Sequence, residues 1–153
     1  MEQNYNKIFT KEISNLFIET FEKVEGFYLD KNTSLFETLN NLSFQDASKQ
    51  RGPIQETIAA HVYHIIFYIK VLHEYITDVR TGKTDWKESW KKNIVNQNDW
   101  DKLKESLRIE YNNLIKFIQS IKKWDNGDYV SGVVSILVHC AYHLGAIRQL
   151  IEL

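Results

Sequence analysis

The chain has 153 residues, 43% of them hydrophobic and 13% aromatic, which is enough apolar material for the core of one domain spanning residues 1–153. Its 19 basic and 20 acidic residues give a formal net charge of -1, so charge gives no reason to expect nucleic acid or an anionic membrane as a partner. The single cysteine, Cys140, excludes an internal disulfide and a multi-cysteine metal site.

Apolar residues recur at helical spacing along most of the chain, which predicts helices rather than strands. The first helix is expected over residues 9–29, where one stripe contains Ile13, Leu16, Phe17, Phe21, Val24, Phe27 and Tyr28. After a polar passage, Ser34 is predicted to cap a short helix over residues 35–42, with Glu37 completing a capping box. Residues 43–53 are predicted to form a loop.

A second long helix is expected to begin near Pro53 or Thr57 and to run to about residue 77. Its interior is rich in Ile, Val, Phe and Tyr, but its length without a turn signal favours a buried helix over a strand. The polar connection after it contains Trp86 and Trp90, four residues apart. A short helix there could fold back and cover a face of the protein.

The third helix is expected over about residues 98–122, and residues 126–128 (Asn-Gly-Asp) are predicted to break the chain after it. The fourth helix should start near Tyr129 or Ser131 and continue to the end. Because it is apolar on nearly all sides as far as Ile147, it should lie centrally or also contact a second subunit. Four long helices in a domain of this size predict an all-α fold, a four-helix bundle.

All five histidines fall in the second and fourth predicted helices. Successive helical residues turn by about 100°, so His139 and His143 project from one side, one turn apart, where a cation can bridge them. His61 and His64 also share a side, whereas His73 is turned away and is expected at the surface or in an outer contact. Three neutral imidazoles from two helices would form an open, catalytic type of metal site. Zinc, nickel, iron and manganese are all candidate ions.

The alternative is that these histidines are structural, each hydrogen-bonded to a carbonyl or a carboxylate in the core. His61 could itself be a ligand, an outer hydrogen-bond donor or a proton shuttle. The patterns Glu-x-x-His, His-Glu-x-x-His and Cys-x-x-Cys-His are absent from the sequence. Their absence excludes the di-iron carboxylate, helical metalloprotease and covalent haem motifs.

Four residues are candidates for catalysis: His61, Glu110, Tyr68 and Tyr142. Glu110 lies on an otherwise apolar line of the third helix, where it could hydrogen-bond a ligand imidazole, act as a general base or simply reach solvent. Tyr68 and Tyr142 could border the open metal position and donate a proton, or could pack as ordinary aromatic residues. Cys140 is expected to be a packed residue rather than a nucleophile.

The two histidine segments resemble motifs of the DinB/YfiT-like family. In its last helix, two histidines four apart precede a Gly- or Ala-containing turn and an Ile, as in residues 139–147, His-Cys-Ala-Tyr-His-Leu-Gly-Ala-Ile. Its second helix begins with Ser or Thr and carries a ligand histidine seven residues later, which matches Thr57 and His64. Two departures concern substrate contacts: Glu56 replaces a frequent Trp, and Ala146 stands where many members have Gln.

The resemblance implies an up-up-down-down four-helix bundle, often dimeric, with a divalent metal held by His64, His139 and His143 at one end of the core. Characterised relatives include thiol S-transferases and a thiol-dependent isomerase. We therefore expect a metal-dependent enzyme for a small molecule, either a transferase that uses a low-molecular-weight thiol or a hydrolase. The alternative is a non-enzymatic, dimeric helical-bundle protein with a structural metal or none.

The polar, acidic first residues are not typical of a secretory signal, and no run approaches the roughly 20 apolar residues of a membrane span. These features predict a cytoplasmic protein.

Overall fold

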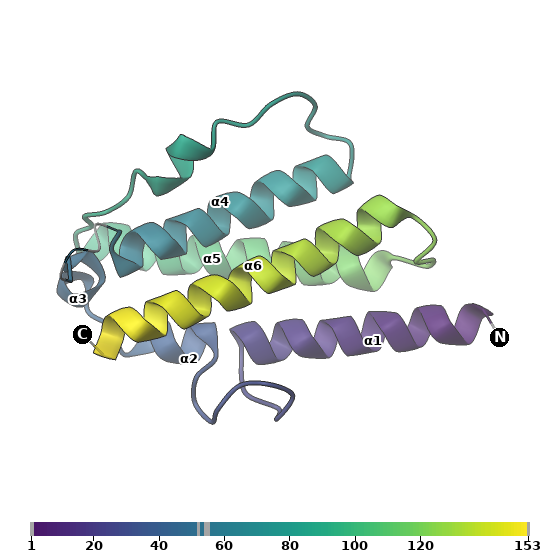
Figure 1. Ribbon diagram of the computed structural model, residues 1–153, viewed down its shortest axis with the longest axis horizontal. Helices are drawn as coiled ribbons and strands as arrows, with labels where there is room; N and C mark the ends of the chain where they lie inside the picture. Colours follow the sequence, from purple (N-terminus) through teal and green to yellow (C-terminus); the bar gives the residue numbers. More distant parts are fainter. Residues whose placement is uncertain (1, 52, 54–55, 153) are drawn as a thin grey trace.

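The computed structural model describes residues 2–51, 53 and 56–152, and the regular elements in that part of the chain are all helices. The fold is therefore all-α, as the apolar spacing predicts. Figure 1 shows four long helices lying side by side: α1 (Glu2–Phe21), α4 (Ile58–Ile76), α5 (Gln97–Ser120) and α6 (Gly127–Glu152). The short ones are α2 (Leu35–Asn40), α3 (Phe44–Ser48) and the 3-10 helix η1 (Trp86–Trp90).

The four long helices do not follow the expected order of directions. In Figure 1, α1 and α6 run from right to left, whereas α4 and α5 both run from left to right. Along the chain the order is thus up, down, down, up, and the up-up-down-down expectation is wrong. Because α4 and α5 point the same way, residues 77–96 travel back along the molecule between them, and η1 lies on this return path.

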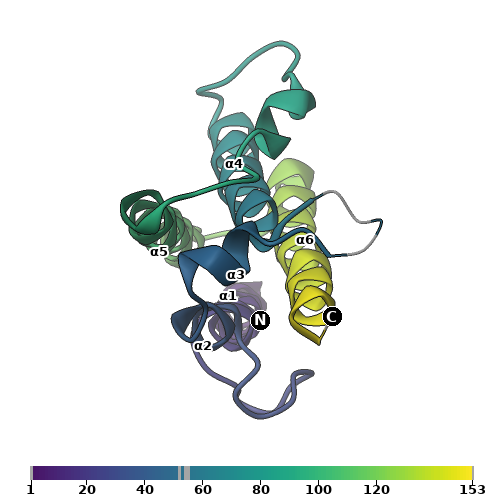
Figure 2. The ribbon, with the colours of Figure 1, turned by 90° about the vertical axis from the view of Figure 1, so that its left-hand side faces the viewer.

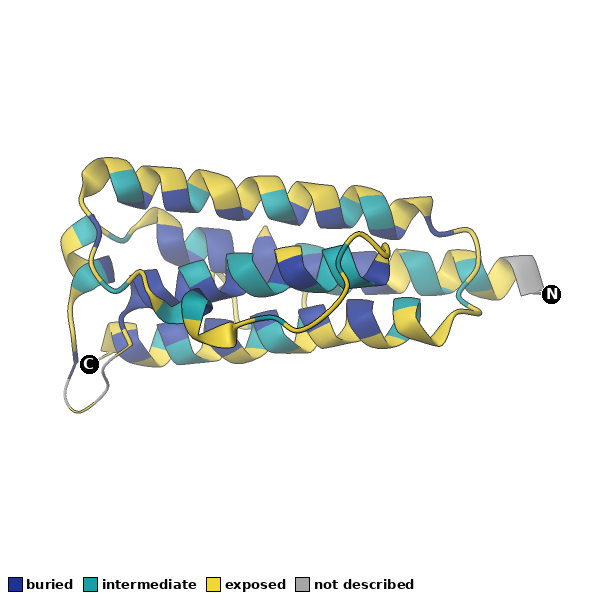
Figure 3. Ribbon diagram, turned by 90° about the horizontal axis from the view of Figure 1, so that it is seen from above, coloured by how far each residue is buried: buried dark blue, intermediate teal, exposed yellow. Residues whose placement is uncertain are grey.

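Helix α4 is the centre of the packing. Figure 2, which looks along the helices, shows α4 between α5 and α6, with η1 above it. Amphipathic α5, the uppermost helix in Figure 3, turns a regular series of buried residues toward this core: Trp100, Leu103, Leu107, Tyr111, Leu114 and Ile118. Gly132 of α6 packs tightly against the end of α4, since a Cβ there would overlap Cδ1 of Ile76 and the Ile76 side chain would have to move.

Helix α1 is displaced toward the N-terminus from its predicted range of residues 9–29, because it begins at Glu2 and ends at Phe21. The end is fixed by the buried carboxylate of Glu19. It accepts hydrogen bonds of 2.6–2.9 Å from four backbone N–H groups, those of Glu25, Phe27, Tyr28 and Leu29. Burial raises the pKa of Glu19, but these four donors outweigh it and lower the pKa to about 2.

The loop predicted over residues 43–53 contains α3, so that prediction is wrong in part; Gly52 lies outside the described residues. Ser43 begins α3 by accepting a hydrogen bond from the backbone N–H of Asp46 at 3.1 Å. The capping box of α2 is confirmed, because the backbone N–H of Ser34 donates to the Glu37 carboxylate at 3.1 Å.

Helix α4 is capped by Thr57, whose hydroxyl accepts a hydrogen bond from the N–H of Ala60 at 3.3 Å. The same hydroxyl donates to the carbonyl of Asn93 at 2.8 Å, and the Thr57 N–H donates to the Asn93 side chain at 3.1 Å. The far end of the return path is therefore tied to the start of α4. The predicted ends of α4 and bounds of α5 agree with the structure closely, whereas Gly127 and Asp128 belong to α6 rather than to a break.

Helix α6 is apolar on nearly all sides, yet one of its faces is open: Val134, Val138 and Tyr142 are 37%, 60% and 72% exposed. In the described part of the chain, α6 is the one helix long and apolar enough to cross a membrane by length and composition. The expectation that no stretch approaches a membrane span is therefore wrong. Core helices of soluble proteins meet the same criterion, so this property alone places no helix in a membrane.

Candidate metal centre

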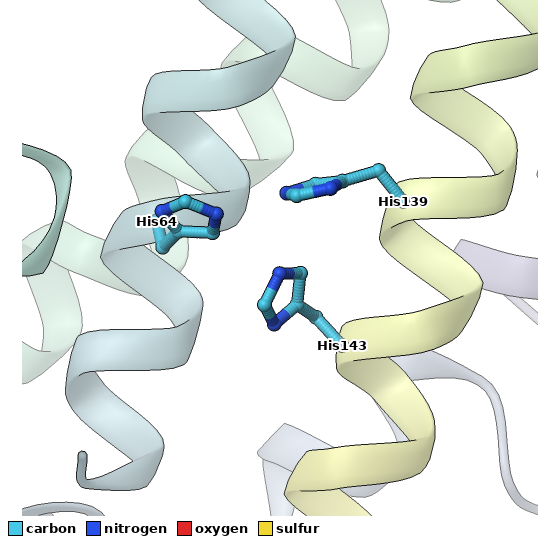
Figure 4. Close-up of side chains that lie close together, drawn as sticks. All are labelled: His64, His139 and His143. Atoms are coloured by element: carbon cyan, nitrogen blue, oxygen red, sulfur yellow. The ribbon is translucent and has the colours of Figure 1, made fainter. Parts of the chain in front are cut away.

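Two helices bring three histidines together. His64 comes from α4, and His139 and His143 come from α6; each offers a ring nitrogen, and these three atoms lie within 4.8 Å of one another. Figure 4 shows the three rings facing a common space between the helices. His64 and His143 are buried and His139 is half-buried. A group of this kind can hold a metal ion, and its members are the three predicted ligands.

The tautomer of His64 follows from the hydrogen bonds of Ser89. The Ser89 hydroxyl donates its one proton to the carbonyl of Trp86 at 2.6 Å. Its contact with His64 Nδ1 at 2.7 Å must then be one in which the serine oxygen accepts, so His64 carries its proton on Nδ1. The lone pair of His64 Nε2 is left for another partner.

His143 is held in a comparable way by His61. The two Nδ1 atoms lie 2.9 Å apart, a hydrogen bond in which one ring donates and the other accepts. His61 is buried but is not in the three-histidine group. The structure therefore places His61 beside a candidate ligand rather than among the candidate ligands.

His139 contains the buried polar atom that remains without a partner. Among the described residues, its Nε2 is the one buried side-chain nitrogen or oxygen atom with no hydrogen bond. The ring lies flat against Tyr68, with centroids 3.6 Å apart and planes inclined by 12°. Tyr68 therefore fixes the orientation of the His139 ring and makes no hydrogen bond to its Nε2.

Burial keeps all three imidazoles neutral at pH 7. It lowers the pKa of His64 to about 4 and that of His139 to about 4, each helped by a neighbouring histidine. Burial, together with His139, His64 and His61, lowers the pKa of His143 to about 3. Neutral imidazole is the form that binds a metal ion, so the environment favours the ligand form of each ring.

The return path folds back over the helices, as the spacing of the two tryptophans predicts, and the face that it covers is the one with the three histidines. Trp90 stacks on His64, with ring centroids 4.0 Å apart and planes inclined by 14°. The Trp90 ring also packs edge-on against the rings of His61 and His143, with centroid distances of 5.4 and 5.7 Å. Trp86 packs against Tyr68 at 5.5 Å. The cover is therefore aromatic, and it limits the access of water to the rings.

A surface hollow of about 410 Å³ lies next to His139. Its lining has no charged side chain and consists of Tyr68, Val134, Ser135, Val138, His139 and Tyr142. Tyr142 is exposed and meets His143 edge-on at 5.0 Å. The structure thus places Tyr68 and Tyr142, both predicted as candidates, at this hollow.

Glu110 acts on His73, which is not one of the three grouped histidines, rather than on a candidate ligand. Its charge acts on His73, where it opposes the burial that lowers the pKa of that imidazole. The ring of His73 packs against Phe117 of α5 at 4.9 Å, so His73 makes an outer contact as predicted. Cys140 is fully buried, which raises the pKa of its thiol and agrees with a packing role.

Ser89 is the residue that the sequence did not reveal. It lies 25 positions from His64 in the chain, and no periodic pattern connects a serine in a polar connection with a helical histidine. The pair of tryptophans around it was the available signal that this segment approaches the helices.

No protein-family model matches the chain, no curated protein is significantly similar to it, and no solved structure matches it significantly.

Proposed function

We propose that this chain binds one divalent transition-metal ion through the Nε2 atoms of His64, His139 and His143. The observation that carries the proposal is the buried, unpartnered Nε2 of His139. A buried polar atom without a hydrogen bond costs roughly 1–3 kcal/mol, and coordination of an ion would remove that cost. Structural histidines, the alternative, would each be expected to have a hydrogen-bond partner.

The donor set fits such an ion. His64 presents an Nε2 lone pair because its Nδ1–H donates a hydrogen bond to Ser89. The lowered pKa values of His64, His139 and His143 leave all three rings neutral at pH 7. Neutral imidazoles suit zinc, iron and nickel, and manganese remains a weaker candidate. Three protein ligands leave a coordination position open, which is typical of catalytic rather than structural sites. When bound, the ion would supply Lewis-acid chemistry to a substrate atom.

We assign the chain to the DinB/YfiT-like family on its two histidine motifs, with four long helices packed side by side whose order of directions differs from the up-up-down-down order that the resemblance implies. The assignment is supported by the agreement between two independent routes to the same residues. The motifs at Thr57–His64 and at residues 139–147 name three ligands, and the side-chain geometry groups the same three.

For the reaction, we favour transfer to or from a low-molecular-weight thiol, with hydrolysis second; the family resemblance supplies this choice. The uncharged hollow beside His139 supports a small molecule as substrate. The chain's own residues would orient the ligands and shield them: Tyr68 holds the His139 ring, and Trp90 covers His64.

Elemental analysis of purified protein tests the proposal, with the expectation of about one transition-metal ion per chain. His143→Ala should reduce the bound metal to background, because two imidazoles hold such an ion far more weakly than three. His73→Ala is the matched control, since its ring faces α5, and it should keep full metal content. Full occupancy in His143→Ala would contradict the proposal.

A second candidate is a dimeric, non-enzymatic protein, favoured by the open apolar face of α6, where Val138 and Tyr142 are exposed. Chelation separates the two functions. Removal of a structural ion should lower the melting temperature strongly. Removal of a catalytic ion should abolish activity with only a modest change in stability. A monomer in sedimentation would count against the second candidate.

A further inference from the structure

We infer that His61 is a positioning residue for the metal centre: its Nδ1 accepts the Nδ1 proton of His143 and thereby directs the His143 Nε2 lone pair at the ion. The inference rests on the proposed metal binding and adds an outer partner to it. The observation behind it is the 2.9 Å contact between the two Nδ1 atoms.

Counting protons fixes the direction of this hydrogen bond. A neutral imidazole has one N–H, and a ring that coordinates through Nε2 must carry it on Nδ1. His143 is therefore the donor when it serves as a ligand. His61 accepts through its own Nδ1, and its proton is on Nε2. In this arrangement the Nδ1 lone pair of His61 is occupied, which agrees with its place outside the three-histidine group.

His61 is held firmly enough to orient its neighbour. It lies in the first turn of α4, where its backbone N–H donates to the carbonyl of the cap residue Thr57 at 3.0 Å. His61 is 8% exposed as a residue, and its ring packs edge-on against Trp90, with planes inclined by 88°. A hydrogen-bond acceptor that is fixed in this way removes rotational freedom from the ligand ring and raises its basicity.

The arrangement at His64 is parallel, with Ser89 in place of His61. In both rings the Nδ1 proton is given to a protein acceptor, so Nε2 is the nitrogen that remains. Two of the three ligands are thus oriented from outside the centre. An apolar residue at position 61 would leave the Nδ1–H of His143 buried without an acceptor.

The test is a titration of metal-free protein with Co²⁺ and Zn²⁺, in the wild-type chain and in two variants. His61→Leu removes the acceptor and should weaken binding by about 10- to 100-fold. His61→Asn puts Oδ1 close to the position of Nδ1 and should recover most of that loss. His73→Leu, a histidine change on the same helix, should bind like the wild type. Circular dichroism verifies that each variant is folded.

Two results would overturn the role of His61: folded His61→Leu binding within threefold of wild type, or folded His61→Asn as weak as His61→Leu. The Co²⁺ absorption bands give a second readout, because they report the ligand set. They should be unchanged in His61→Asn, and a shifted spectrum would make His61 a ligand instead. Failure of the wild-type chain to bind either ion would reject the metal centre itself, which is a distinguishable outcome.

Discussion

Two buried polar groups in this protein have opposite surroundings. The carboxylate of Glu19 is completely enclosed and accepts four backbone hydrogen bonds, while Nε2 of His139 is enclosed and accepts none. The first arrangement is complete within the chain and fixes where α1 ends. The second is incomplete and sits among two further imidazoles. The contrast is between a polar group whose hydrogen bonds stabilise the fold and one whose lack of a partner supports the proposed metal centre.

The largest expected effect comes from removing a hydrogen-bond acceptor from the fully hydrogen-bonded side chain of Glu19. Glu19→Gln keeps one carbonyl oxygen but turns an amide N–H₂ toward two backbone donors, so we expect a loss of about 4 kcal/mol in the free energy of unfolding. Urea denaturation measures it, with Glu12→Gln on the exposed side of α1 as the control. Metal affinity should stay within threefold of wild type. A Glu19→Gln protein as stable as the wild type would show that the hydrogen bonds of Glu19 do not stabilise the fold.

The pH dependence of stability should separate the two regions. The pKa values of about 4, 4 and 3 for His64, His139 and His143 lie below the ordinary 6.5, so the unfolded chain takes up protons first as the pH falls. Stability of the metal-free protein should therefore drop below pH 6.5 and level off near the folded pKa values. The contribution of Glu19 is present above its ordinary pKa of 4.5 and is lost between 4.5 and about 2.

Between pH 6.5 and 4.5, then, the histidines should dominate. From pH 7 to pH 5 we expect a loss on the order of 3 kcal/mol in the free energy of unfolding, measured by urea denaturation. His139→Phe, which keeps an aromatic ring against Tyr68, should make this dependence shallower. Equal stability at pH 7 and pH 5 would show that the rings are not protected from protonation.

The smallest expected effect on stability concerns the hydrogen-bonded hydroxyl of Thr57, which begins the helix that carries His64. Thr57→Ala removes the cap of α4 and the hydrogen bond to Asn93, and should cost about 1–2 kcal/mol. Thr57→Ser should restore most of that stability in the same denaturation assay. We expect Thr57→Ala to alter stability more than metal affinity; the reverse would make Thr57 part of the site.

Much of this structure could be predicted from local pattern. The spacing of His139 and His143 places both on one side of a helix without knowledge of the fold, and Ser34 with Glu37 marks the start of α2. The meeting of His64 with that pair is a tertiary event. Residue spacing alone left His61 and His64 as alternatives, and the family motif was needed to choose His64.

Two of the failures, the end of α1 and the role of Ser89, share a physical cause, which is hydrogen bonding by a side chain to residues outside its own helical turn. The apolar stripe of α1 continues through Phe27 and Tyr28, so helical spacing predicts a longer helix. The bonds that end it come from a side chain 6 to 10 positions earlier. Ser89 reaches His64 across 25 positions. Neither contact leaves a periodic trace in the sequence.

The common direction of α4 and α5 determines whether the histidines are covered. With 19 residues, α4 is about 28 Å long, and the chain must travel that distance backwards before α5 begins. Residues 77–96 could span roughly 66 Å if fully extended, so more than half of their reach is surplus. Part of that surplus is coiled into η1 above the imidazoles. Joining α4 to an antiparallel α5 by a tight turn would leave the same three rings open to water.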